Sequence, residues 1–351
     1  MIFQESLKLT LHLQLIATTQ QPKLELSYPV VQAIRQQTRA QGLQASVEAI
    51  AAGHNEEVRT IPMRDGFQSE IRIHRPKTTT PEHERDSPLI VSIYGGGFVM
   101  GNNMQFAPIA RRLTSLFNAV VVCISYRLAP EHPWPQSHHD AWDSLFWLAA
   151  NATSIGADPS KAGFILHGAS AGGNIAAVLT QKSLSDEGKA LLGPAKITGV
   201  ALDVPMIFKD PENVPSEHKP LYLSFEQNKD APGMLTPQAV EYIRSAVKGD
   251  GFSPDFSPVN AANACVGMPP VLIQAAGMDL YRDDALIYDR MLRAKGVETR
   301  LKVYPGVPHG HAHMYPSLKL TREANVDFLE GMGWLLGHEV AREEVEGALR
   351  L

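Results

Sequence analysis

The chain has 351 residues, and its 32 Lys and Arg against 37 Asp and Glu give a formal charge of −5 at pH 7. A mildly acidic chain lacks the basic face that nucleic-acid binding requires, and two cysteines are too few for a disulfide scaffold or a four-thiolate zinc site. Its apolar runs are far shorter than the roughly 20 residues of a membrane-spanning helix, so no membrane span is expected.

The N-terminus does not have the pattern of a secretion signal. Glu5, Lys8 and His12 interrupt its apolar residues, and no small-residue cleavage site follows. We therefore expect a cytoplasmic protein.

The first part of the chain has two regions that differ in composition and in residue pattern. Residues 1 to about 55 are rich in Gln and Ala with helical spacing, and residues 57–75 alternate as paired strands do. From Leu89 on, short apolar runs alternate with helical stretches. The runs lie at 89–93, 119–124, 162–167, 197–203, 271–275 and 300–304, and the helices at 109–117, 142–148, 171–182, 284–295 and 322–336. This alternation predicts an α/β fold with parallel strands buried on both faces.

The alternation stops between Pro205 and Pro258, where prolines recur. Such a long connection usually covers a site or forms a binding loop. We assign it to a lid, together with the N-terminal helices. The chain then divides into an N-terminal lid segment (1–55), a core in two parts (56–204 and 259–351) and a lid insertion (205–258). Alternatively, residues 1–55 fold as a separate domain, but they are few for independent stability. Residues 338–351 read as an amphipathic helix, either packed on the core or part of a partner surface.

A Gly-x-Ser-x-Gly sequence, Gly168 to Gly172, joins an apolar run to the helix that begins at Ala171. Such a strand-to-helix turn is strained and holds the serine hydroxyl out at the carboxyl edge of the sheet. The helix N-terminus behind Ser170 offers N–H groups to a developing oxyanion. We interpret Ser170 as a nucleophile; alternatively, it only caps the helix.

Three glycines, Gly95 to Gly97, follow the first apolar run of the core. The N–H groups of Gly96 and Gly97 can point at one oxygen, with the N–H of Ala171 as a third donor, and each donor contributes on the order of 3 kcal/mol to transition-state stabilisation. A phosphate-binding loop would need a following Lys-Ser/Thr pair, and dinucleotide-binding glycine spacing is also absent. The loop therefore predicts an oxyanion hole.

These two motifs, together with the stretch Ser125-Tyr126-Arg127-Leu128-Ala129-Pro130-Glu131-His132-Pro133, resemble the hormone-sensitive-lipase-like branch of the α/β-hydrolases over roughly residues 57–340. The resemblance implies an α/β-hydrolase fold with a mostly parallel eight-stranded sheet and a lid made by the N-terminus and a mid-chain insertion. It also implies hydrolysis of carboxylic esters without a cofactor.

A nucleophilic serine needs a general base and a carboxylate that orients the base. Asp279 follows the apolar run 271–275, at the position of the family's acid. Asp283 and Asp284 compete for this role, but they fall in the first turn of the next helix, where the helix dipole favours carboxylates.

His309 occupies the family's His-Gly position and is the predicted base. His311, two residues on, should point elsewhere. Three alternating histidines, His309, His311 and His313, could suggest a metal site, but no carboxylate or cysteine ligand pattern accompanies them, and no metal is expected. The stretch from His138 to Asp140 predicts helix capping and structural hydrogen bonds, and Cys123 a packing thiol.

Two positions depart from the family's pattern. Tyr94 stands where a histidine usually precedes the three glycines, and Ala169 stands where an aspartate usually precedes the serine. The Tyr94 hydroxyl could brace the glycine loop or reach the oxyanion itself.

The predicted function is that of a serine carboxylesterase, a monomer or homodimer, which cleaves a small or medium apolar ester through an acyl-enzyme. The candidate pocket residues are Tyr94, Phe98, Met100, Phe208, Leu221, Tyr222 and Phe225. Two alternatives stay open. One is a biosynthetic enzyme on the same scaffold that performs acyl transfer, condensation or elimination, motivated by Tyr94 and Ala169. The other is a catalytically silent protein that binds a small apolar hormone or lipid.

Overall fold

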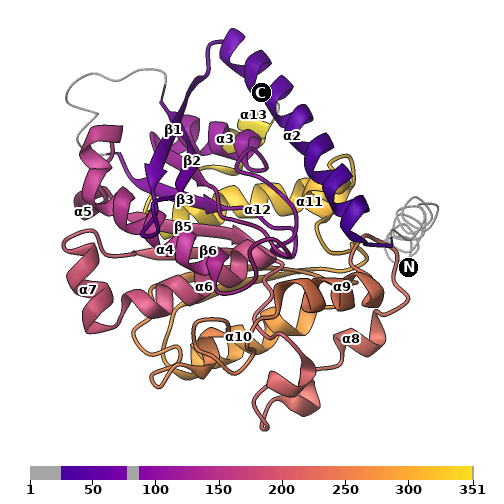
Figure 1. Cartoon of the computed structure of the whole chain (residues 1–351). Helices are drawn as coiled ribbons and strands as arrows, with labels where there is room; N and C mark the ends of the chain where they lie inside the picture. The colour runs from indigo at the N-terminus through magenta and orange to yellow at the C-terminus, as the bar shows by residue number, and fades with distance from the viewer. Residues whose placement is uncertain (1–24, 77–86, 350–351) are drawn as a thin grey trace.

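The computed structural model describes residues 25–76 and 87–349 (Figure 1). Two expectations concern residues 1–24, namely that they belong to a lid and that they are not a secretion signal. Both fall outside the described residues.

An eight-stranded sheet with the order β1-β2-β4-β3-β5-β6-β7-β8 forms the centre of the molecule. Its strands are β1 (Asn55–Pro62), β2 (Gln68–Arg75), β3 (Leu89–Ile93), β4 (Val120–Ile124), β5 (Phe164–Ala169), β6 (Gly199–Asp203), β7 (Val271–Ala276) and β8 (Thr299–Tyr304). β2 is antiparallel to both of its neighbours, and every later pair is parallel. This is the mostly parallel sheet that the resemblance implies.

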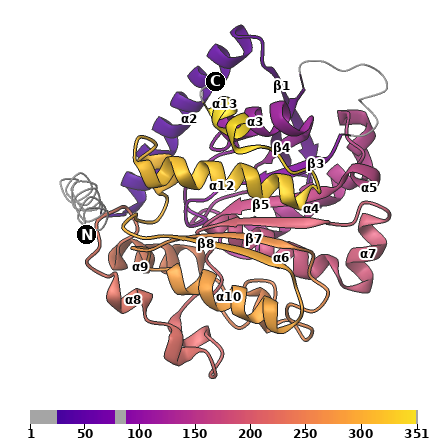
Figure 2. The ribbon, with the colours of Figure 1, turned by 180° about the vertical axis from the view of Figure 1, so that it is seen from behind.

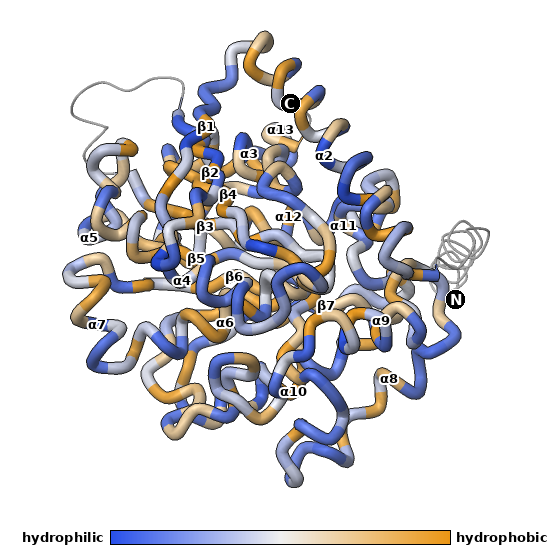
Figure 3. The backbone as a smooth tube through the Cα atoms, in the orientation of Figure 1, coloured by the Kyte–Doolittle hydropathy of each residue, from blue (hydrophilic) through white to orange (hydrophobic). Residues whose placement is uncertain are grey.

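Helices cover both faces of the sheet (Figures 1 and 2). One face carries α3 (Ala107–Phe117), α12 (Lys319–Leu335) and α13 (Arg342–Leu349). The other carries α4 (Gln136–Asn151), α6 (Ala171–Ser183), α7 (Asp186–Leu192) and α10 (Arg282–Ala294). The short α5 (Pro159–Ala162) directly precedes β5. All five residues of β3 and of β4 are buried, because helices pack on both sides of them. Figure 3 shows hydrophobic and hydrophilic residues alternating along helices such as α2. In α3 the apolar residues Ala110, Leu113 and Phe117 are buried.

The strand at 299–304 differs from the expectation of a strand buried on both faces. β8 is exposed or half-buried at every position except Tyr304, and Val303 is 42% exposed. The physical reason is its place at the end of the sheet, where it has a neighbour on one side only.

Segments from three parts of the chain gather at the right-hand side in Figure 1. They are the N-terminal helix α2 (Tyr28–Ala51), the short α11 (His311–Met314) and the insertion between β6 and β7. The insertion contains α8 (Ser224–Gln227), α9 (Pro237–Val247) and three single 3-10 turns, η3 (Pro211–Asn213), η4 (Lys219–Leu221) and η5 (Pro258–Asn260). A fourth 3-10 turn, η2 (Ala152–Ile155), follows α4.

Candidate functional site

Ser170 lies in a strained turn between β5 and α6. Its backbone has φ 53° and ψ −117°, a left-handed conformation that L-residues avoid. The turn also needs close backbone contact, since a Cβ on Gly172 would lie 2.0 Å from the carbonyl oxygen of Ile93. The Ser170 N–H donates to the carbonyl of Asp203 at 2.9 Å, which fixes the turn to the end of β6.

A chain of hydrogen bonds joins Ser170, His309 and Asp279. His309 Nε2 lies 2.8 Å from Ser170 Oγ, and His309 Nδ1 lies 2.6 Å from Asp279 Oδ2. Asp279 is 1% exposed, and its other oxygen accepts the N–H of Tyr281 at 2.9 Å. The three side chains follow the carboxyl ends of β5, β7 and β8, which parallel strands bring to one edge of the sheet.

Electrostatics favour a charged imidazole at this position. Burial alone would lower the pKa of His309, but the charge of Asp279 and its hydrogen bond outweigh burial and raise that pKa. An imidazolium that forms when His309 accepts a proton is therefore stabilised.

The two later histidines have other partners. His311 Nδ1 lies 2.8 Å from Thr321 Oγ1, and His313 packs on Phe106 with ring centroids 5.3 Å apart. Burial lowers the pKa of His311 and of His313 to about 4. In 25–76 and 87–349, no three His, Cys, Asp or Glu side chains are grouped to hold a metal ion.

The glycine loop after β3 leaves two of its N–H groups available. Gly96 has φ 124°, which glycine tolerates, and the N–H of Gly95 donates to Gln105 Oε1 at 2.8 Å. The N–H groups of Gly96, Gly97 and Ala171 make no hydrogen bond within the described part of the chain. These are the three donors predicted for an oxyanion.

Arg35 of α2 holds the same loop from outside. Its Nε donates to the carbonyl of Val99 at 2.7 Å and its Nη2 to the carbonyl of Ala129 at 2.6 Å. The guanidinium also pairs with Glu131 at 2.7 Å. Helix α2 is thus fastened both to the residues that follow the glycines and to the Tyr-Arg-Leu-Ala-Pro-Glu stretch itself.

Tyr94 makes a reciprocal pair with Tyr126. Each hydroxyl donates to the other residue's carbonyl at 2.9 Å, and the rings stack with centroids 4.2 Å apart. Burial raises the pKa of both phenols. Of the two roles considered for the Tyr94 hydroxyl, this geometry supports the brace, because the hydroxyl is engaged by a carbonyl.

We expect Tyr94→Phe to lose about 1 kcal/mol of unfolding free energy, because one buried hydrogen bond disappears. Turnover of p-nitrophenyl acetate should change less than about threefold. Urea unfolding and steady-state kinetics measure the two effects, with Tyr126→Phe as the matched control for the partner hydrogen bond. A fall in kcat of about 100-fold or more would instead indicate a lost oxyanion donor.

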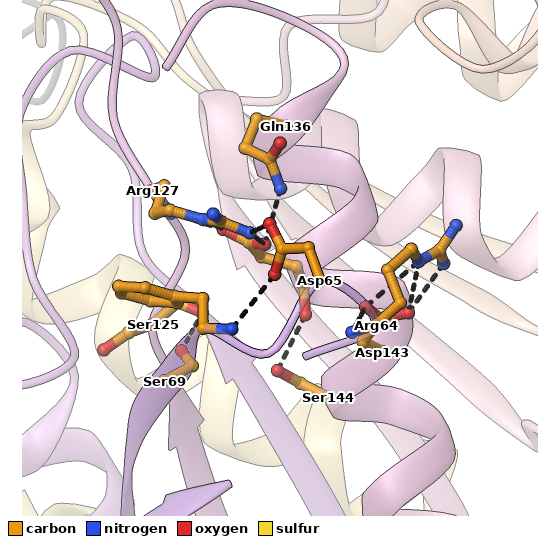
Figure 4. A network of polar contacts seen from close by, with 10 residues as sticks. Arg64, Asp65, Ser69, Ser125, Arg127, Gln136, Asp143 and Ser144 are labelled. Atoms are coloured by element: carbon orange, nitrogen blue, oxygen red, sulfur yellow. Dashed lines mark hydrogen bonds and ion pairs between the residues drawn. The ribbon is translucent and has the colours of Figure 1, made fainter. Parts of the chain in front are cut away.

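A polar network around Arg127 holds the Ser125-to-Pro133 stretch in place (Figure 4). Arg127 forms two hydrogen bonds to the fully buried Asp140 of α4, at 2.9 and 2.7 Å, and a further ion pair with Asp65 at 2.7 Å. Gln136 donates to Asp140 as well, at 2.9 Å. The network anchors the segment that carries Tyr126 and so supports the brace on the glycine loop.

The stretch from His138 to Asp140 has the structural hydrogen bonds that the sequence predicts, but the predicted helix cap is wrong, because α4 begins earlier, at Gln136, and has no side-chain cap. His138 Nε2 lies 2.9 Å from Asn174 Oδ1, and the Asp140 carboxylate receives Arg127. Cys123 is buried in β4, and burial raises the pKa of its thiol to about 12, as for a packing thiol.

Asp284 anchors the insertion. Its Oδ1 accepts the N–H groups of Ile207 and Phe208 at 2.7 and 2.8 Å, and its Oδ2 accepts the hydroxyl of Tyr222 at 2.9 Å. Burial raises the pKa of Asp284 to about 8, although these hydrogen bonds oppose the rise. The sequence interpretation as a first-turn carboxylate is therefore incomplete.

Asp283 does the same for the next part of the insertion. Its Oδ2 accepts the N–H groups of Leu223 and Ser224, both at 2.6 Å. Neither anchor could be read from the sequence, because the partners lie about 60 or more residues away; a pair of acids after the predicted catalytic aspartate was the only signal.

Asp203 is a further titratable group that the sequence analysis missed. It lies at the end of β6, and burial raises its pKa to about 6 while His309 opposes the rise. The position of Asp203 at the end of a core strand is the sequence signal that could have identified it as a residue near the site.

A very small cavity, about 10 Å³, lies beside the glycine loop. Its lining includes Phe98, Met206, Ile243, Val247, Phe256 and Tyr281. Of these, only Phe98 was predicted. The volume is about that of one water-sized probe, so only a small group fits there.

The other predicted pocket residues lie outside this cavity. Tyr94, Met100 and Phe208 are buried in the core, whereas Leu221 is 44% exposed because it ends the surface turn η4. Tyr222 is held by Asp284, and Phe225 packs under the guanidinium of Arg244 at 5.5 Å. Tyr222 is thus held away from the cavity, because the insertion folds back onto α10, whereas Phe225 reaches the cavity only through Arg244, which lines it.

Known proteins are similar to this chain over most of its length. Residues 90–313 match a protein family that is described as "alpha/beta hydrolase fold". "AB hydrolase superfamily protein B1A11.02" of Schizosaccharomyces pombe is 34% identical over 278 residues, 79% of each chain. "Carboxylesterase NlhH" of Mycobacterium tuberculosis is 32% identical, over 69% of this chain and 71% of that protein. The crystal structure of vibralactone cyclase has a TM-score of 0.80 at 29% identity and covers 91% of this chain and 92% of its own.

These matches confirm the α/β-hydrolase fold that the sequence predicts. Among the helices of the described residues, none is long and apolar enough to cross a bilayer.

Proposed function

The chain belongs to the hormone-sensitive-lipase-like branch of the α/β-hydrolases, and we propose that it is a serine carboxylesterase with Ser170 as nucleophile, His309 as base and Asp279 as the orienting acid. The observation that carries the proposal is the unbroken chain of hydrogen bonds at 2.8 and 2.6 Å through these three side chains. Esterase relatives support the same chemistry.

The proposed reaction has two steps. His309 Nε2 takes the Ser170 proton as Oγ attacks the ester carbonyl, and the N–H groups of Gly96, Gly97 and Ala171 hold the oxyanion. His309 then gives that proton to the departing alcohol, which leaves an acyl-enzyme on Ser170. Water, deprotonated by His309, attacks the acyl group, and His309 returns this proton to Ser170 Oγ as the bond to the acyl group breaks and the acid leaves.

The proposed substrate is a small or medium apolar ester. The cavity of about 10 Å³ beside the glycine loop is lined mostly by apolar side chains, which supports a small group at one end of the ester. We further propose that α2 and the insertion 205–258 act as the lid. Arg35 fastens the first to the glycine loop, and Asp284 fastens the second to the helix after Asp279.

A fluorophosphonate tests the nucleophile. It should add one phosphonyl group to the peptide that contains Ser170 and abolish hydrolysis of p-nitrophenyl acetate in parallel, both measured on the same samples by mass spectrometry and absorbance. Labelling of another residue, or no labelling, would contradict the proposal. Absence of any labelling would favour the alternative of a catalytically silent binding protein.

A biosynthetic enzyme on the same scaffold is the second candidate. The similarity to vibralactone cyclase favours it, as do Tyr94 and Ala169 at positions where the family usually has histidine and aspartate. Labelling of Ser170 combined with weak activity on every ester of a chain-length panel would select this candidate over the esterase.

A further inference from the structure

A second, larger cavity lies away from the proposed catalytic residues. Its volume is about 590 Å³, within the range of small-molecule sites, and it is bordered by α3, the start of β1, the end of β2 and α13. α3 runs from the glycine loop to the start of β4, so its last residues lie at the amino edge of the parallel strands. Ser170 lies at the opposite, carboxyl edge.

Buried polar atoms beside this cavity lack partners. His74, 1% exposed, lines the cavity, and neither of its ring nitrogens has a hydrogen-bond partner among the described residues. The same holds for Nη1 of Arg111 and Oε2 of Glu56. Because buried polar groups are almost always satisfied, such a group of unsatisfied atoms indicates a missing ligand or water.

Glu56 does not supply the missing partner. Its Oε1 is taken by Arg72 at 2.7 Å and by Ser46 at 2.5 Å. Its Oε2 lies 3.8 Å from both His74 Nδ1 and Arg111 Nη1, beyond hydrogen-bond distance. Burial and the nearby guanidinium groups of Arg111 and Arg72 lower the pKa of His74 to about 4, against the charge of Glu56, so His74 is neutral and can donate one hydrogen bond.

Positive charge is in excess in the cavity. Arg111 and Arg112 are neighbours on α3, and Arg112 has no hydrogen bond or ion pair with any residue in 25–76 or 87–349. Burial lowers the pKa of both, and the charge of Arg111 lowers that of Arg112 further. The single Glu56 carboxylate, 3.8 Å from Arg111, also pairs with Arg72 at 2.7 Å, so it does not balance the charges of both Arg111 and Arg112. A bound anion would stabilise these half-buried guanidinium groups.

We propose that this cavity binds the phosphate group of a small organic phosphate, held by Arg111, Arg112 and His74. A phosphate dianion matches two guanidinium groups in charge and in the geometry of their paired donors. The apolar wall of Pro76, Pro108 and Ala348 would contact the organic part. This site goes beyond the proposed esterase function and shares no residue with it.

The test is thermal unfolding of the full chain in inorganic phosphate or phenyl phosphate, with chloride at equal ionic strength as the blank. A ligand that binds the folded state raises Tm saturably, here by roughly a few degrees. Arg112→Gln should lose this rise, whereas Arg290→Gln, which removes one charge from an exposed site on α10, should keep it. Tighter binding of phenyl phosphate identifies an ester as the ligand, and equal affinity identifies free phosphate; both support the site.

Equilibrium dialysis of radiolabelled phosphate with the wild-type chain gives a readout that does not depend on the variant's folding. No saturable binding overturns the proposal, and so does an equal Tm rise in Arg112→Gln. Acetate binding as tightly as phosphate would also overturn it, because a dianion would then have no advantage. Ser170→Ala should bind phosphate like the wild type, so loss of esterase activity and loss of this site are distinguishable.

Discussion

Replacing Ser170 by alanine is expected to lower kcat for p-nitrophenyl acetate by about 10⁴- to 10⁶-fold. The nucleophile is then absent, while the N–H groups of Gly96, Gly97 and Ala171 still bind the carbonyl oxygen. A small residual rate above that of water is therefore expected. Steady-state kinetics with the purified variant measure it.

Ser154→Ala is the matched control, since Ser154 is exposed and bonds only to the carbonyl of Asn151. It should keep the wild-type rate. If Ser170→Ala also hydrolysed the ester at that rate, the assignment of the nucleophile would be wrong. Unfolding curves for both variants separate a chemical effect from a loss of folded protein.

Removing the carboxylate of Asp284 should release the insertion from α10. Asp284→Ala leaves two backbone N–H groups and the Tyr222 hydroxyl without an acceptor, and each unsatisfied buried donor costs about 1–3 kcal/mol. We expect rapid proteolysis within residues 205–258 and a KM raised more than kcat is lowered, since the triad contacts do not involve this residue. Limited proteolysis with mass spectrometry and steady-state kinetics measure these effects.

Asp289→Ala provides the comparison, because Asp289 is buried on the same helix but bonds to Arg293 and Thr299. It should lose stability without specific cleavage of the insertion. An Asp284→Ala chain with the cleavage pattern of the wild type would show that the insertion is held by other contacts.

The fold was predictable because its signals are local. A short, continuous apolar run such as 89–93 predicts a strand that is buried on both faces. The stretches between these runs have the periodicity of helices, which can cover the two faces. The strand at 299–304 was misjudged since its exposure depends on its position in the sheet, which no local pattern encodes.

The candidate site was predictable where a motif marks the residue. Ser170 lies in a turn that requires glycine, and Asp279 and His309 follow strand ends. Side-chain partners distant in sequence were not predictable, as Asp284 with Phe208 and Arg127 with Asp140 illustrate. The insertion was also hard to interpret, because its helices are short and the connections between them contain prolines.

The fastening of α2 has a consequence for biosynthesis on the ribosome. The acceptors of Arg35 are carbonyls that follow it by 64 and 94 residues. At about 5–20 residues per second, the ribosome adds the second acceptor on the order of ten seconds after the arginine. Helix α2 therefore emerges before the loop that it secures exists, and the glycine loop acquires this support only later in translation.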